Sequence, residues 1–161
     1  MPSQMKVAMK LYLVQHGLAK SADEDPKRPL SPQGIEETEK TALFLASKSL
    51  NPKKIFHSSK LRAKETAGII AAKTSPGVSA IEKEGLAPKD DPVIWMKNLE
   101  EENDDVMLVG HLPQLARLAS LLLCGNSEKE VVRFSNSCVV CLERNDDGLW
   151  RLVWAAPTRL L

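Results

Sequence analysis

The sequence predicts an α/β protein: a three-layer α/β/α sandwich with a mostly parallel central sheet and an antiparallel edge hairpin. Strand-like and helix-like segments alternate, which is typical of a parallel sheet covered by helices. The apolar runs at residues 11–14 and 106–109 are continuous, as expected for strands buried on both faces. Strand-like segments 138–143 and 150–154 flank residues 145–148 (NDDG), which signal a hairpin turn. The 161 residues suit one domain, 1–161.

The individual elements follow from local signals along the chain. Residues 6–14 are expected to form the first strand, and residues 20–29 form a polar loop. Ser31 has an N-capping side chain and Pro32 suits the first helical position, so a helix begins there and continues to about residue 50. Further on, the pattern predicts strands at 54–57, 78–81 and 106–109, helices at 61–73 and 91–102, and a helix beginning at Pro113.

The charge balance narrows the class of protein. Lys plus Arg number 22 and Asp plus Glu 21, so we expect no broad electrostatic binding to nucleic acid. Any specificity for an anion must come from a few placed cations. The first apolar run is too short for a membrane span or a signal-peptide core, and Lys6 and Lys10 interrupt it, so a cytoplasmic protein without membrane partners is expected.

The cysteines agree with that compartment. Because there are three, at least one stays unpaired, which suits a reducing environment. Cys138 and Cys141 form a C-x-x-C pair, but no second pair of ligands accompanies it and it lies in a strand-like run. We therefore interpret both as structural, buried cysteines and expect neither a metal nor a cofactor.

Three predicted strands end in polar side chains. His16 follows the first strand, His111 follows the strand at 106–109, and Ser58 follows the strand at 54–57. Ligands of open α/β sheets bind at the carboxyl ends of the strands. Arg62 lies in the first turn of the next helix, where unpaired N–H groups favour anions. Arg28, in the loop before the first helix, is placed to reach the same crevice.

Two histidines with arginines and helix ends indicate phosphoryl chemistry. A neutral imidazole is a good nucleophile near pH 7, so His16 is a candidate to form a phosphohistidine intermediate. Arg62 and His111 would then neutralise the oxygens of the group in transfer. His57, the third histidine, falls within its strand, where burial or capping accounts for it.

At these residues the chain resembles the histidine phosphatase (phosphoglycerate mutase-like) superfamily, and in particular the small SixA-type phosphohistidine phosphatases. Residues 13–17 (LVQHG) match the R-H-G motif and residues 28–34 (RPLSPQG) match R-P-L-[ST]-x-x-G. Residues 58–66 (SSKLRAKET) match S-x-x-x-R-A-x-[EQ]-T, and residues 109–113 (VGHLP) match [GS]-H-x-P. Order and spacing agree over nearly the whole chain.

The resemblance implies a set of roles. His16 would be the phosphorylated nucleophile, with Arg62 and His111 as the other catalytic residues in the phosphate pocket. Gln15, Arg28 and Ser58 would be further phosphate-binding residues. The expected partner is a phosphorylated protein carrying phosphohistidine, or a small phosphorylated substrate.

Gln15 departs from the family pattern, which has arginine before the nucleophile. A hydrogen bond to a charged group contributes roughly 1.5–3 kcal/mol, against about 1 for a neutral pair. The exchange is therefore expected to cost about one to two factors of ten unless Lys20 or Lys60 compensates. An active enzyme is favoured, and the alternative is a catalytically impaired protein that binds phosphate or phosphohistidine.

The leaving group separates the candidate substrates. Cleavage of a phosphomonoester generally needs an acid to protonate the departing alkoxide, whereas a phosphoramidate departs as imidazole. Glu84 and Asp90 are the candidate acids, and neither stands in a distinctive motif. Protein phosphohistidine is therefore the favoured substrate, and a small-molecule phosphomonoester is the alternative.

Overall fold

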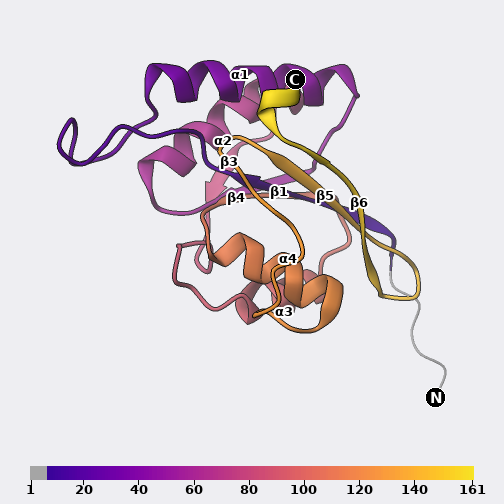
Figure 1. Cartoon of the computed structure of the whole chain (residues 1–161). Helices are drawn as coiled ribbons and strands as arrows, with labels where there is room; N and C mark the ends of the chain where they lie inside the picture. The colour runs from indigo at the N-terminus through magenta and orange to yellow at the C-terminus, as the bar shows by residue number, and fades with distance from the viewer. Residues whose placement is uncertain (1–6) are drawn as a thin grey trace.

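The computed structural model describes residues 7–161 and contains one six-stranded sheet of order β3-β2-β4-β1-β5-β6 (Figure 1). The strands β3, β2, β4 and β1 are parallel, and β5 and β6 join them as antiparallel strands at one edge. This confirms the expected mostly parallel sheet with an edge hairpin. The strands are β1 (Met9–Gln15), β2 (Lys54–His57), β3 (Ala80–Glu82), β4 (Val106–Gly110), β5 (Val139–Arg144) and β6 (Trp150–Ala156).

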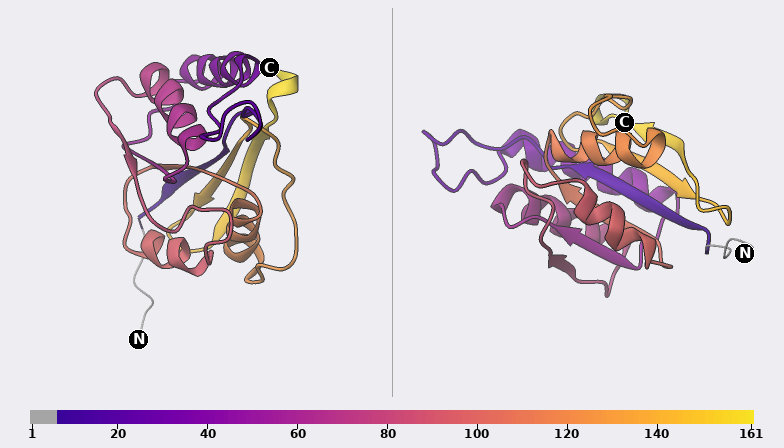
Figure 2. Two further views of the ribbon diagram at one scale, coloured as in Figure 1. Left: turned by 90° about the vertical axis from the view of Figure 1, so that its left-hand side faces the viewer. Right: turned by 90° about the horizontal axis from the view of Figure 1, so that it is seen from below.

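Helices cover both faces of the sheet, which completes the three layers (Figures 1 and 2). On one face lie α1 (Pro32–Ser47) and α2 (Leu61–Thr74), and on the other lie α3 (Val93–Glu100) and α4 (Gln114–Cys124). A short 3-10 helix, Thr158–Leu160, packs against α1 near the carboxyl terminus. No helix within residues 7–161 is long and apolar enough to cross a lipid bilayer.

The continuous apolar run of β1 is explained by its central position. Leu11 and Leu13 pack into the core beneath α3 and α4, whereas Tyr12 and Val14 pack into the core beneath α1 and α2. Because both faces of the strand are covered, no polar residue alternates with the apolar ones. The same holds for β4, all of whose residues are buried.

Local signals located the elements well, and the boundaries differ for identifiable reasons. Ser31 caps α1 by accepting a hydrogen bond from the Gly34 amide at 3.0 Å. The helix expected at 91–102 is shorter, because Asp91 accepts the Val93 amide at 3.0 Å and the helix begins only at Val93. The first strand begins at Met9; Lys6, where it was expected to begin, lies outside the described residues.

The C-x-x-C pair is split by the sheet. Cys138 belongs to the core beneath α3 and α4, and Cys141 to the core beneath α1 and α2. Their thiols are unpaired, and burial is the main reason that the pKa of each is raised. Cys138 directly precedes β5 and Cys141 lies within it, on opposite sides of the sheet. Thiols on opposite sides of the sheet cannot hold the same metal ion, so this geometry agrees with the structural interpretation.

Candidate active site

Parallel pairing brings three strand ends to one edge of the sheet. In the register, Gln15 of β1 lies opposite Gly110 of β4, and His57 of β2 lies opposite Val109. The next residues along the chain are His16, His111 and Ser58, so all three emerge side by side. The pairing continues one step past β1, because the His16 amide donates to the Gly110 carbonyl at 3.0 Å.

The imidazole of His16 is oriented for attack through Nε2. Its Nδ1 lies 2.7 Å from the Gly17 carbonyl, which can only accept, so Nδ1 carries the proton and Nε2 carries the lone pair. Burial lowers the pKa of His16, and the charges of Arg62 and Arg28 lower it further, although the hydrogen bond to Gly17 opposes them. The ring is therefore neutral, and nucleophilic, at neutral pH.

His111 faces His16, with ring centroids 4.8 Å apart. Its Nε2 lies 2.6 Å from the hydroxyl of Ser58, and that hydroxyl also accepts the Lys60 amide at 3.3 Å. The hydroxyl has one proton and a second lone pair left for Nε2, so either atom can be the donor of this bond. In the described part of the chain the other ring nitrogen, Nδ1, is buried without a partner, so it is free to contact a bound group.

Burial is the main reason that the pKa of His111 is lowered to about 3, and the nearby charges of His16, Arg62, Lys60 and Arg28 contribute. The unfolded chain, whose histidine titrates near 6.5, binds more protons than the folded protein between these two values. The free energy of unfolding therefore decreases as the pH falls through this window, and His111 contributes nothing to pH dependence above it.

We expect a His111→Asn variant to lose this dependence. Between pH 6.5 and 5, its free energy of unfolding should decrease by about 1.5 kcal/mol less than that of the unmodified protein. Urea denaturation at both pH values measures the difference. Equal decreases in the two proteins would show that His111 titrates at its ordinary pKa.

Arg62 and Arg28 supply the positive charge. Burial lowers the pKa of Arg62, and so does the charge of Arg28. Arg62 Nε is buried without a hydrogen-bond partner among residues 7–161. Arg28 adopts a left-handed backbone with φ of 48°, and its Nε donates to the Lys20 carbonyl at 3.1 Å. Two guanidinium groups that repel each other form a site where a bound dianion would relieve the repulsion.

Gln15 is half-buried at the end of β1, beside His16 in the chain. Its Oε1 is buried and has no hydrogen-bond partner within the described residues. The amide brings no charge, so the positive charge of the site comes from Arg62, Arg28 and the nearby lysines. Of the two lysines considered for compensation, Lys60 affects the pKa of His111, whereas Lys20 contributes its carbonyl to Arg28.

The motif around Arg62 also fixes the neighbouring loops. Thr66 accepts the Gly17 amide at 2.9 Å and donates to the Arg62 carbonyl at 2.7 Å, which ties the loop of His16 to α2. Glu65 accepts the Leu30 amide at 3.0 Å and holds the loop that carries Arg28. Both residues stand in the motif matched at 58–66, and their positioning roles are visible only in the structure.

Two further features constrain the loop after β1. A side chain at Gly17 would approach Thr38 Oγ1 to 2.6 Å, so only glycine fits there. Asn136, which lies far along the chain, donates from Nδ2 to the His16 carbonyl at 3.0 Å and so holds the loop in place. Sequence reasoning missed Asn136, because no motif surrounds it and the contact spans 120 residues.

The two candidate acids lie in a hollow of about 370 Å³, which Ser58 and Ser59 also line. The Asp90 carboxylate accepts the Ala87 amide at 2.9 Å, so it is engaged in its own turn. Glu84 uses its backbone carbonyl to accept from Trp95 Nε1 at 3.0 Å. Neither carboxylate has a hydrogen bond to His16, His111 or Arg62 in the described chain.

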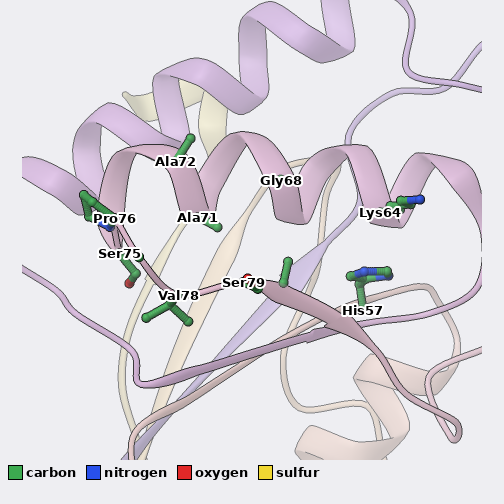
Figure 3. Close-up of a pocket in the computed structure, with 11 residues that line it drawn as sticks. His57, Lys64, Gly68, Ala71, Ala72, Ser75, Pro76, Val78 and Ser79 are labelled. Atoms are coloured by element: carbon green, nitrogen blue, oxygen red, sulfur yellow. The ribbon is translucent and has the colours of Figure 1, made fainter.

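His57 does not belong to this cluster. It is buried, its Nδ1 donates to the Ser58 carbonyl at 2.8 Å, and its ring points toward α2 (Figure 3). It lines a separate cavity of about 390 Å³ between α2 and β3, together with Lys64, Ser75 and Val78. Neither His16 nor His111 lines that cavity, which agrees with a structural role for His57.

Comparisons with known proteins agree with this fold and identify the family. The model of the histidine phosphatase superfamily (branch 1) matches residues 11–88. An uncharacterized protein of Picosynechococcus sp. is 35% identical over 126 residues, which cover 74% of this chain and 76% of that protein. The mouse mitochondrial serine/threonine-protein phosphatase PGAM5 is 38% identical over 96 residues, 55% of this chain but only 32% of the mouse protein.

Solved structures extend the likeness to the whole fold. The protein histidine phosphatase SixA, in complex with tungstate, matches with a TM-score of 0.83 at 23% identity, over 94% of this chain and 99% of SixA. A putative α-ribazole-5′-P phosphatase from Escherichia coli matches with a TM-score of 0.77 at 16% identity, over 93% and 97% of the two chains. The chain belongs to the histidine phosphatase superfamily.

Proposed function

We propose that this protein is a phosphatase that acts through a phosphohistidine intermediate on His16, and that its substrate is phosphohistidine in a protein. One observation carries the proposal: the free Nε2 of His16 and the unpartnered Nδ1 of His111 belong to rings 4.8 Å apart, beside Arg62 and Arg28. A nucleophile, a donor and two cations around one position are what a phosphoryl group in transfer requires.

In the first step the His16 Nε2 lone pair attacks phosphorus, and the bond between phosphorus and the substrate's imidazole nitrogen breaks. The departing imidazole takes a proton from water, and the phosphoryl group is left on His16. In the second step water attacks the phosphorus and the bond from phosphorus to Nε2 breaks. Inorganic phosphate departs, Nε2 regains its lone pair, and the proton that the attacking water gives up replaces the one taken from water in the first step. Arg62 and Arg28 hold the equatorial oxygens, and His111 donates from Nδ1. Ser58 then acts through His111: its hydroxyl donates to Nε2 and so keeps that ring in the tautomer that carries the proton on Nδ1.

The charges that remain support turnover despite Gln15. Arg62 and Arg28 retain two guanidinium groups, each able to form a bidentate contact with phosphoryl oxygens. The neutral His16 supports the same conclusion, since a protonated imidazole could not attack. We therefore favour an active enzyme over a protein that only binds phosphate.

The carboxylates support phosphohistidine as the substrate. Asp90 is bonded to its own turn, and neither it nor Glu84 contacts the histidines. An alkoxide leaving group would lack a placed acid, whereas imidazole needs little help to depart. We also propose a cytoplasmic location, because the cysteines are unpaired and two of them are buried as thiols, as in a reducing compartment.

The test compares two peptides of one sequence, one carrying phosphohistidine and the other phosphoserine. We expect kcat/KM to be about 100-fold higher for the phosphohistidine peptide, since general acid catalysis contributes at least this factor. Release of inorganic phosphate is measured against a His16→Ala blank, which corrects for spontaneous hydrolysis. Equal values for the two peptides would favour a phosphomonoesterase. Binding of both without release would favour the binding protein.

A further inference from the structure

A cationic cavity of about 590 Å³ opens beside the histidines, between the loop after β1 and the beginning of α2. Lys27, Arg28, Lys60 and Arg62 line it, and no acidic residue does. Neither His16 nor His111 lines it, so it adjoins the position of phosphoryl transfer and does not coincide with it. Arg28 and Arg62 belong both to this cavity and to the proposed phosphate site. The loop extends outward from the body of the molecule, as the indigo segment of Figure 1 shows.

The positive charge in this cavity is uncompensated. Within residues 7–161, none of its four cations forms an ion pair. Lys27 and Lys60 are exposed, and Arg62 Nε is buried without a partner. One phosphoryl group at His16 would occupy Arg62 and Arg28, which leaves the two lysines without a bound anion. Unpaired cations gathered in a concave site favour an additional anion.

The other side of the site carries the opposite charge. Ser59 borders both the cationic cavity and the hollow that contains Glu82, Glu84 and Asp90, with Lys83 as its one cation. A substrate that crosses the site therefore meets cations on one side and carboxylates on the other. Such an arrangement favours one direction of binding and discriminates between flanking charges.

We propose that the cationic cavity binds a second anionic group of the same substrate, a carboxylate or a second phosphate, and that Lys27 and Lys60 determine this specificity. The inference rests on the proposed function, since it places the first phosphoryl group at His16. Lys60 is well placed for this role, because it immediately precedes α2 and lines the cavity together with Arg62. Lys27, next to Arg28 in the chain, lines the same cavity.

The test is made in the His16→Ala background, where binding is measured without turnover. Two phosphohistidine peptides that differ by one flanking residue, Asp or Asn, are titrated by calorimetry. We expect the Asp peptide to bind about tenfold more tightly, and the combined Lys27→Met and Lys60→Met substitutions to remove this preference. The matched control is Lys64→Met with Lys73→Met, two exposed lysines of α2 that do not line the cavity, and it should keep the preference.

A second arm identifies the source of the anion. Propyl phosphate is compared with propane-1,3-diol bisphosphate in the same three variants. A preference for the bisphosphate that depends on the two lysines would assign the cavity to a second phosphate. A preference confined to the peptides would assign it to a carboxylate. If the lysine substitutions change neither the affinity ratio of the two peptides nor that of the two phosphate compounds, the inference is wrong.

Turnover by the unmodified protein separates the inference from the proposed function. If both peptides are hydrolysed and the lysine substitutions do not change the ratio of their affinities, the proposed phosphatase function stands and the inference about the cavity is wrong. If the Asp peptide binds more tightly because of the two lysines but neither peptide is hydrolysed, the inference about the cavity stands and the proposed phosphatase function is wrong.

Discussion

Replacing His16 by alanine is expected to abolish turnover, with kcat/KM of the phosphohistidine peptide falling by about 10⁴-fold or more. The side chain carries the attacking lone pair, and the neighbouring His111 cannot substitute for it. Its Nε2 is hydrogen-bonded to Ser58, and in the proposed mechanism its Nδ1 carries the proton that it donates. Loss of the nucleophile therefore removes the covalent route entirely.

Trapping of the intermediate provides the direct measurement. Brief exposure of the unmodified protein to substrate, followed by a quench in alkali, should leave acid-labile phosphate on His16. A His57→Gln variant is the matched control, because His57 lies in a separate cavity and contacts neither imidazole. If the His16→Ala variant is still labelled, or if the His57→Gln variant is not, the phosphoryl group is not carried by His16 as proposed.

Replacing Arg62 by alanine has the second largest expected effect, a decrease in kcat/KM of about 10²–10³-fold. The guanidinium lies in the first turn of α2, where it adds two donors to the positive end of the helix. Arg62→Lys should recover only part of the activity, because lysine restores the charge and not the planar fork.

Stability should respond to Arg62→Ala in the opposite direction. Burial and Arg28 both lower the pKa of Arg62, so the folded protein holds this charge at a cost in free energy. We expect the Tm of Arg62→Ala to equal or exceed that of the unmodified protein, a trade of stability for function. Arg151→Ala is the matched control: this arginine pairs with Asp147 at the exposed hairpin, near the other end of β1, and should retain activity. A large decrease in Tm for Arg62→Ala would show that Arg62 is structural.

Much of the site could be located from sequence because its residues directly follow buried strands. A continuous apolar run followed by histidine is a local pattern, and it marks His16 and His111 without reference to any contact. The parallel topology then places both at the same edge. The helix starts could also be located, since Ser31 and Pro32 are signals read within one turn.

The positioning residues could not be located in this way. Asn136 reaches His16 across 120 residues of chain, from a segment between α4 and β5 that forms no regular element. Whether Asp90 serves as an acid or as a turn residue depends on one hydrogen bond to Ala87. Such contacts depend on how separate elements pack together.

Hydrophobic periodicity and capping act over short spans of chain, so the α/β class, the order of the elements and the residues that end the strands could all be read from the sequence alone. The folded structure was needed to show which ring nitrogen of each histidine already has a hydrogen-bond partner, which cations lie around one cavity, and that Cys138 and Cys141 occupy opposite cores. Hydrogen bonding, burial and charge repulsion depend on atoms that approach one another in space from distant parts of the chain.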